Sequence, residues 1–218
     1  MKVNAEKFLD NFDQYKFEKT VFFVTGNEEG LINKVQNIIL SKHKSNIYKE
    51  IKILDLRTSN KIDLKELTHT QSFFNKSNVF QIKNPNDSLI TSLEKINFEN
   101  NTIIINGVNI RNNSKIKKYF DSHNKFYSIV CYKLTKAFKK KLIDKLFNQN
   151  NCKISKDAYW FFLENSSDDY QILENEIIKI SNYDKVGASV KDISKLSCNA
   201  DSSQFEDLFF QCIGGSNQ

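Results

Sequence analysis

The sequence predicts an α/β domain with a mostly parallel sheet, followed by a small all-helical domain. Up to Lys133, short runs of β-branched and aromatic residues alternate with segments whose apolar residues recur at helical spacing. Strands that alternate with helices pair in parallel, because each helix carries the chain back to the same edge of the sheet. After Lys133 only the helical spacing continues. The expected domains are 1–134, which is α/β, 135–200, which is helical, and 201–218, the start of a truncated third helical domain or a tail.

Five segments of the first domain have the composition of strands. Val21–Thr25 is an apolar run rich in aromatic and β-branched residues, and Thr102–Ile105 is the pattern of a buried strand. Glu50–Leu56 alternates in polarity, so Ile51 and Ile53 are expected to share a side. The predicted strands are 21–25, 50–56, 79–82, 102–105 and 126–132.

The segments between these strands predict helices. In 29–41, Leu31, Val35, Ile38 and Ile39 fall on one helical face. Further predicted helices are a short one capped by Asp63 with Glu66 as the capping box, and those at 89–96 and 114–120.

Capping residues mark four helices in the second domain. A hydroxyl or carboxylate directly before an apolar-periodic segment accepts a hydrogen bond from the first backbone N–H groups of the helix. In the first helix, apolar residues recur at helical spacing from Phe138 to Leu146. The expected caps are Thr135, Ser155, Ser167 or Asp168, and Ser189 with Asp192 completing a capping box.

Composition excludes several classes of protein. Hydrophobic residues make up 39% of the 218 residues, which is enough for a core, and the single Pro disfavours a loop-rich all-β fold. The net charge of +6 is compatible with nucleic-acid binding, but many soluble proteins have such an excess. The four cysteines are widely spaced and no CxxC occurs, so neither a metal site nor a disulfide framework is expected. No apolar run approaches membrane-spanning length, and a cytoplasmic protein without a cofactor is the expectation.

The segment Val21–Leu40 has the outline of a phosphate-binding loop: a strand, a turn and a helix. A functional loop reads G-x-x-x-x-G-K-[ST], in which Lys contacts the phosphates and the hydroxyl holds Mg²⁺. Here Gly26 and Gly30 enclose three residues instead of four, and Leu31 and Ile32 stand where Lys and Ser/Thr are needed. The simpler interpretation is a plain turn with Gly at a positive φ.

Charge opposes nucleotide binding at the same place. Glu28 and Glu29 put negative charge where a triphosphate would lie, and even a solvated like-charge contact at ~4 Å costs about 1 kcal/mol. The strand expected to supply a Mg²⁺-binding carboxylate, Thr102–Ile105, is followed by Asn106 and Gly107. Hydrolysis of ATP is therefore not expected.

Two adjacent aromatic residues, Phe73 and Phe74, stand in a stretch rich in Ser, Asn and Lys. Adjacent residues do not easily face one core stripe, so they are candidates for an aromatic plug that enters a pocket on a partner. The alternative is that both pack on the sheet.

The run "LTKAFKKKLIDK" places four lysines at the start of a predicted helix, where Lys136 and Lys140 align. A solvated outer face is one interpretation, and contact of Lys136, Lys139 and Lys140 with DNA phosphates is the other. The aromatic run that begins at Trp160 lies within an amphipathic helix and is expected to be core.

Four segments together resemble the delta subunits of bacterial DNA polymerase III, which belong to the clamp loader. "FFVTGNEEGLINK" resembles the opening strand and degenerate loop of that family, and "TQSFFNKSNVFQIK" resembles its Ser-Leu-Phe segment and following strand. "NTIIINGVNIRNNSKIKKYF" resembles its strand and basic helix, and "ISKDAYWFFLENSSDDYQILENEIIKISNY" resembles its lid domain. The resemblance covers about residues 18–213.

The resemblance implies an AAA+-like, P-loop NTPase-like α/β domain, a helical lid domain and a helical collar domain, and we expect this chain to lack the collar domain. It implies a subunit of the DNA-directed DNA polymerase (nucleotidyltransferase) holoenzyme that has no activity of its own. Such a subunit opens the ring-shaped sliding clamp with a hydrophobic wedge, matched here by Phe73 and Phe74 with Gln71 beside them. Phe73 replaces the usual Leu, and Gln71 is polar where the family often has an apolar residue.

The implied partners are the sliding clamp, the other clamp-loader subunits through the collar domain, and DNA in the assembled complex. Two alternatives stay open: an active AAA+ ATPase, and a stand-alone DNA-binding module that uses the lysines between Lys136 and Lys145.

Overall fold

A computed structural model describes most of the chain and divides it into two compact units, Met1–Lys133 and Leu134–Gln218. The predicted short helix at Asp63 lies outside the described residues, and so does the predicted third segment, 201–218, apart from Ile213. No helix within the described ranges combines the length and the apolar character that spanning a bilayer requires. The described residues are 1–12, 21–44, 51–58, 79–94, 101–183, 187–197 and 213.

The first unit contains a six-stranded sheet in which neighbouring strands are parallel, in the order β1-β6-β2-β5-β4-β3. The predicted parallel α/β fold is thus confirmed. β2 and β5 lie at the centre, and every residue of β2 is buried, as expected for a strand that is covered on both faces. The strands are β1 Lys2–Asn4, β2 Val21–Gly26, β3 Ile51–Asp55, β4 Val79–Lys83, β5 Thr102–Val108 and β6 Tyr127–Cys131.

The edge strand β1 was not predicted from the sequence, because three residues carry no periodic pattern. Pairing with β6 defines it, and Ser128 N–H donates to the carbonyl of Met1 at 2.9 Å. The ammonium group of Met1 donates to the carbonyl oxygens of His123 and Phe126. These bonds connect β1 to the residue that ends the helix before β6 and to the residue that precedes β6.

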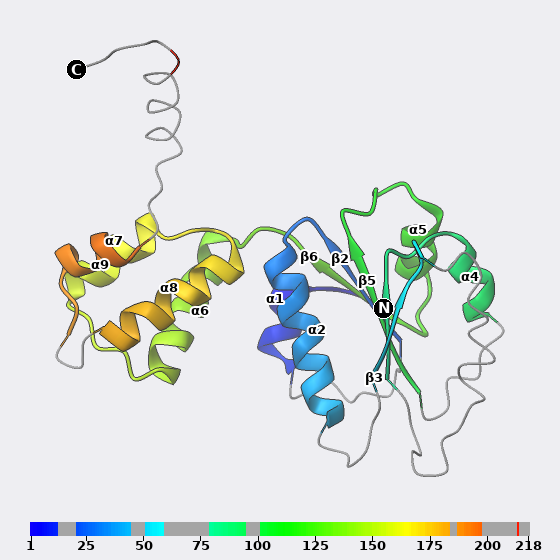
Figure 1. The fold of residues 1–218 in the computed structure, drawn as a ribbon, viewed down its shortest axis with the longest axis horizontal. Coiled ribbons are helices and arrows are strands. Elements are labelled where there is room, and N and C mark those ends of the chain that lie inside the picture. Colours follow the sequence, from blue (N-terminus) through cyan, green and yellow to red (C-terminus); the bar gives the residue numbers. More distant parts are fainter. Residues whose placement is uncertain are drawn as a thin grey trace. The chain divides into compact units, whose positions relative to one another are not determined.

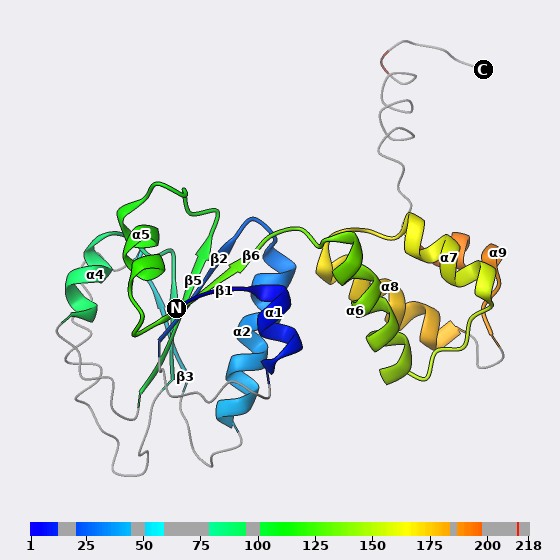
Figure 2. The ribbon, with the colours of Figure 1, turned by 180° about the vertical axis from the view of Figure 1, so that it is seen from behind.

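Helices cover both faces of the sheet (Figures 1 and 2). One face carries α1 and α2, and the other carries α4 and α5. The N-caps of α1 and α5 are Asn4 and Ser114, whose side chains accept from backbone N–H groups in the first turn. The helices are α1 Ala5–Asp10, α2 Glu29–Lys44, α4 Ser88–Leu93 and α5 Lys115–Ser122.

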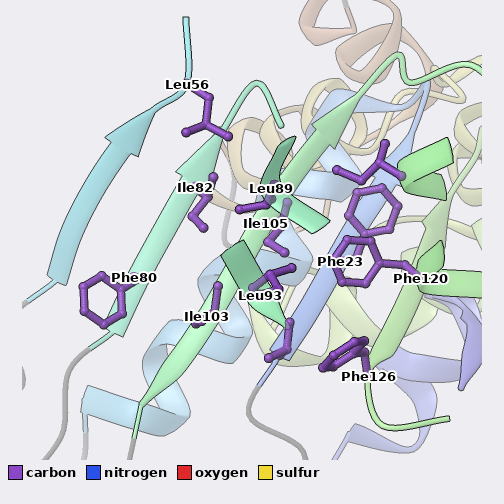
Figure 3. Packing of buried hydrophobic residues seen from close by; sticks show 12 residues of the cluster. Phe23, Leu56, Phe80, Ile82, Leu89, Leu93, Ile103, Ile105, Phe120 and Phe126 are labelled. Carbon is purple, nitrogen blue, oxygen red and sulfur yellow. The ribbon is translucent and has the colours of Figure 1, made fainter. Parts of the chain in front are cut away.

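Alternate residues of the central strands build the core on the α4 and α5 face (Figure 3). The ring of Phe23 from β2 stacks on the ring of Phe120 from α5, with centroids 4.5 Å apart. Phe120 in turn contacts Phe126, at 5.6 Å between centroids. Leu89 and Leu93 of α4 complete this layer.

The second unit is helical, and three of its predicted caps are confirmed. Thr135, Ser155 and Ser189 accept from backbone N–H groups in the first turns of α6, α7 and α9, and Ser189 forms the predicted capping box with Asp192. Each such cap stabilises a helix by about 1 kcal/mol. The helices are α6 Lys136–Gln149, α7 Lys156–Asn165, α8 Tyr170–Tyr183 and α9 Val190–Leu196.

The predicted cap of α8 was wrong. Asp169 holds that position, because its carboxylate accepts from Ile172 N–H at 3.1 Å. The hydroxyl of Ser167 accepts from Asp169 N–H at 3.0 Å, and this bond lies before the first turn of the helix. The carboxylate of Asp168 accepts from the Lys139 ammonium at 3.0 Å instead.

Lys139 and Trp160 also depart from the sequence-based expectations. The Lys139 side chain is buried, and its ammonium donates to the carbonyl of Ser166 as well as to Asp168. Lys139 therefore connects α6 to the segment that leads into α8. It does not belong to a solvent-exposed row of lysines. In α7, Phe162 is fully buried as predicted, whereas Trp160 is 43% exposed.

We expect Lys139→Met to lower the free energy of unfolding by about 1–3 kcal/mol, because the buried carbonyl of Ser166 loses a charged donor. The exposed Lys145 on the same helix offers a matched control, and Lys145→Met should change stability by less than about 0.5 kcal/mol. Urea unfolding followed by the fluorescence of Trp160, the one Trp in the chain, measures both variants in the unit that contains them. Equal stability of the two variants would show that the Lys139 contacts contribute nothing.

Candidate functional site

The strand-to-helix turn after β2 packs in close contact with Cys131, the last residue of β6. Gly26 has a φ of +150°, and a Cβ atom at this position would lie 1.8 Å from the carbonyl oxygen of Cys131. Only Gly tolerates both the conformation and the contact. The same carbonyl accepts the N–H groups of Asn27 and Glu28, at 3.2 and 3.3 Å. Two backbone donors of this turn are thus already bonded within the protein.

Glu28 caps the helix that follows. It is only 3% exposed, and its carboxylate accepts the N–H of Leu31. Its carbonyl accepts the N–H of Ile32 at 3.1 Å, so Glu28 is the last residue before the helical turns of α2. A carboxylate of the chain therefore occupies the N-terminus of this helix, the position at which a phosphate binds in a functional loop.

Apart from the exposed and acidic Glu29, the remaining residues of the turn are packed or neutral. Gly30 lies in the first turn of α2 and is buried, as are Leu31 and Ile32 that follow it. Burial, with Glu28 as a second cause, strongly raises the pKa of the Cys131 thiol, so that side chain stays protonated at neutral pH. The turn therefore offers packing in place of the cation and hydroxyl that nucleotide binding needs.

β5, which lies beside β2, and β4, the next strand, end near amides and a lysine where an ATPase needs carboxylates. β5 leads into Asn106 and Gly107 near its end, and β4 ends at Lys83 and is followed by Asn84. The described part of the chain holds no group of three or more His, Cys, Asp or Glu side chains that could bind a metal ion. The side chains at these two strand ends are amides and a lysine, whereas Mg²⁺ is usually held by carboxylates.

Asp55, at the end of β3, is occupied by neighbours. Its carboxylate accepts from the Arg57 guanidinium at 3.2 Å and from Asn84 Nδ2 at 2.8 Å. The hydrogen bonds from Arg57, assisted by Asn84, lower the pKa of Asp55 to about 2. The Asp55 carboxylate is therefore charged at all pH values near neutrality. Its hydrogen bonds connect the end of β3 to Asn84, which follows β4.

An open, largely polar groove of about 650 Å³ lies along these strand ends. Glu29 and Asn33 of α2 line one side, and Lys83 and Asn106 line the other. Gln81, which also lines the groove, donates to Gln36 Oε1 at 2.8 Å. Among the described residues, neither Gln36 Nε2 nor Asn106 Oδ1 has a hydrogen-bond partner, although both are buried. The groove thus combines amides with two cations, Lys83 and Arg57, of which Arg57 is paired with Asp55.

The predicted clamp-binding residues Gln71, Phe73 and Phe74 lie outside the described residues, which resume at Val79, the first residue of β4. Their assignment stays a prediction. Of the three lysines predicted to lie near DNA, Lys136 and Lys140 are exposed on α6. Lys139 is withdrawn from that set by its contacts with Ser166 and Asp168.

Comparisons with solved structures place this architecture among AAA+-like proteins. The chain is similar to the Bacillus subtilis DNA clamp loader delta protein (YqeN), with a TM-score of 0.58 and 12% identity over 98% of this chain and 73% of that one. It is also similar to two structures of Thermotoga maritima RuvB. For the first, the TM-score is 0.58 and the identity 11%, over 97% of this chain and 76% of that one. The second is described as a Holliday junction branch migration motor, with a TM-score of 0.54 and 12% identity over 88% and 67%.

No protein-family model matches the sequence, and a search of curated proteins found no match. At these identities the structural likeness shows the fold: an AAA+-like parallel-sheet domain followed by a small helical domain.

We expect Gly26→Ala to destabilise the first unit by about 3 kcal/mol or more, because the new Cβ overlaps the Cys131 carbonyl and φ is strained. Gly187→Ala is the matched control. Its φ is also positive, at +129°, but the nearest atom to the new Cβ is 3.7 Å away. That variant should lose only about 1–2 kcal/mol. Urea unfolding followed by far-ultraviolet circular dichroism compares the two, and similar losses would contradict a special role for the Gly26 contact.

Proposed function

We propose that this chain is a non-catalytic clamp-loader subunit that binds and opens the DNA sliding clamp during replication, as part of a DNA polymerase III holoenzyme. In this proposal the chain has no enzymatic activity of its own. It contributes binding energy, and other subunits of the complex turn over ATP.

The proposal rests on the turn between β2 and α2, whose backbone N–H groups are hydrogen-bonded within the chain. The fold alone does not discriminate, because a clamp loader delta protein and a branch migration motor match it with similar scores. A motor needs a phosphate loop, whereas here Cys131 accepts two of the N–H groups of the turn and the Glu28 carboxylate accepts the N–H of Leu31. With Leu31 and Ile32 in place of Lys and Ser/Thr, the turn supports a scaffold role.

A subunit without ATP chemistry can still move a partner. A ligand shifts a conformational equilibrium only by the difference between its affinities for the two states. A wedge of Phe73 and Phe74 would meet this condition if the open clamp offers these rings a pocket that the closed clamp does not. Aromatic side chains suit this role, since they bury large areas at a small cost in conformational entropy.

We expect the double substitution Phe73→Ala and Phe74→Ala to weaken binding to the sliding clamp of the same organism by at least about 30-fold, since interface hot spots contribute about 2 kcal/mol or more. The measurement is a titration of labelled clamp by surface plasmon resonance. Ile53→Ala, which truncates a 60%-exposed apolar side chain on β3, is the control and should bind like the unsubstituted chain.

Two outcomes count against the proposal in different ways. Undiminished binding by the double variant would refute the wedge but keep the clamp as partner. A lack of binding by the unsubstituted chain, folded by circular dichroism, would refute the clamp-loader assignment itself.

We also expect no saturable binding of Mg²⁺–ATP by the isolated chain up to roughly 1 mM, since affinities weaker than this contribute under about 4 kcal/mol. The physical reasons are the Glu28 carboxylate at the helix N-terminus and the absence of Lys and Ser/Thr at positions 31 and 32. Isothermal titration calorimetry measures this directly. A dissociation constant in the micromolar range would favour the active ATPase instead.

A further inference from the structure

We propose that the outer surface formed by α6 and α7 binds single-stranded nucleic acid, with Trp160 as a stacking platform and Lys136 and Lys140 as contacts for the phosphates. This surface lies in the second unit, and the inference does not depend on the clamp-loader proposal.

Trp160 is the first observation. It is 43% exposed although its helix is otherwise packed through fully buried residues such as Ala158 and Phe162. The rings of Tyr159 and Trp160 are T-shaped to one another, with centroids 5.5 Å apart at an angle of 83°. The Tyr159 hydroxyl donates to Asp144 at 2.6 Å, which ties this ring to α6. Trp160 thus projects from an anchored helix and stays partly exposed to solvent.

The charge beside the indole is the second observation. The ammonium of Lys140 lies 5.4 Å from the centre of the Trp160 ring, a cation–π distance. Lys136 is four residues earlier on α6 and therefore shares the same side of that helix. Both lysines are exposed, in contrast to the buried Lys139 between them.

The whole outer side of α6 is basic. Its exposed charged residues are four lysines and one aspartate. The aspartate, Asp144, is the acceptor for Tyr159, so part of its charge is screened by that hydroxyl. On α7, Lys156 precedes Trp160 by one turn, while Asp157 and Glu164 are the acidic residues of that helix. The cations therefore concentrate on the α6 side of the indole.

This combination fits an unpaired nucleotide strand better than a duplex. An aromatic face stacks on a base of any sequence, and lysines beside it contact the phosphates. A nucleotide stacked on Trp160 would carry its phosphate close to the Lys140 ammonium. Duplex bases are already stacked and offer the indole no free face. DNA and RNA strands share this chemistry, and the test separates them.

Trp160 is the one Trp in the chain, so its fluorescence reports on this surface alone. We expect oligo(dT) or oligo(U) of about 12 nucleotides to quench it saturably, more strongly than a duplex of the same length. Affinity should fall as salt rises. Lys140→Gln and Lys136→Gln should each lower the salt slope by about 0.7. Lys191→Gln, which removes an exposed charge from α9 of the same unit, should change neither affinity nor slope.

A second measurement separates the contribution of ring stacking to affinity from that of the lysine charges. In fluorescence anisotropy with labelled oligonucleotide, Trp160→Leu should weaken binding at least about fivefold, and Trp160→Phe, which keeps a ring, should weaken it less. A preference between the DNA and RNA strands identifies the natural source.

Four results would overturn the inference: no quenching by either strand at low salt, stronger quenching by duplex, equal losses in Lys140→Gln and Lys191→Gln, or equal quenching by polyglutamate. The last would assign the surface to an acidic protein.

Discussion

The carbonyl oxygen of Cys131 holds the turn on which the first unit depends. It accepts two N–H groups of the turn after β2, and it lies so close to Gly26 that only a hydrogen atom fits there. This contact joins the central strand, its neighbour β6 and the start of α2 at one point. Because the backbone groups are satisfied within the chain, the turn is stable without a ligand, which sets it apart from loops that rely on phosphate to pair their donors.

The same constraint shapes what the protein can do. A helix N-terminus is a ready site for an anion, and here the anion is the Glu28 carboxylate. The fold is AAA+-like, and within it the turn after β2 is held by hydrogen bonds and packing within the chain. Such a scaffold can position surfaces for partners, and its effect on a partner must then come from differential binding. The proposed clamp-opening role is consistent with this requirement.

Much of the fold follows from patterns that are local in sequence. The apolar runs predicted all but one of the strands, and hydroxyls before apolar-periodic segments predicted three helix caps, because both signals arise from residues within one or two turns of each other. β1 was missed because only its pairing with β6 makes it a strand. The cap of α8 was missed because Ser167, Asp168 and Asp169 are all competent caps, and a distant lysine engages one of them.

The sequence by itself determined the parallel α/β domain, the helical domain and the presence of Leu31 and Ile32 where a phosphate loop has Lys and Ser/Thr, since these depend on residue type and spacing alone. Tertiary structure decided which charges are available. Lys139 and Lys140 are neighbours of identical type, yet one is buried against Asp168 and the other lies beside an exposed Trp160. The physical reason is that burial and pairing of a side chain depend on residues far away in the chain, as for Lys139 and Asp168, which are 29 positions apart.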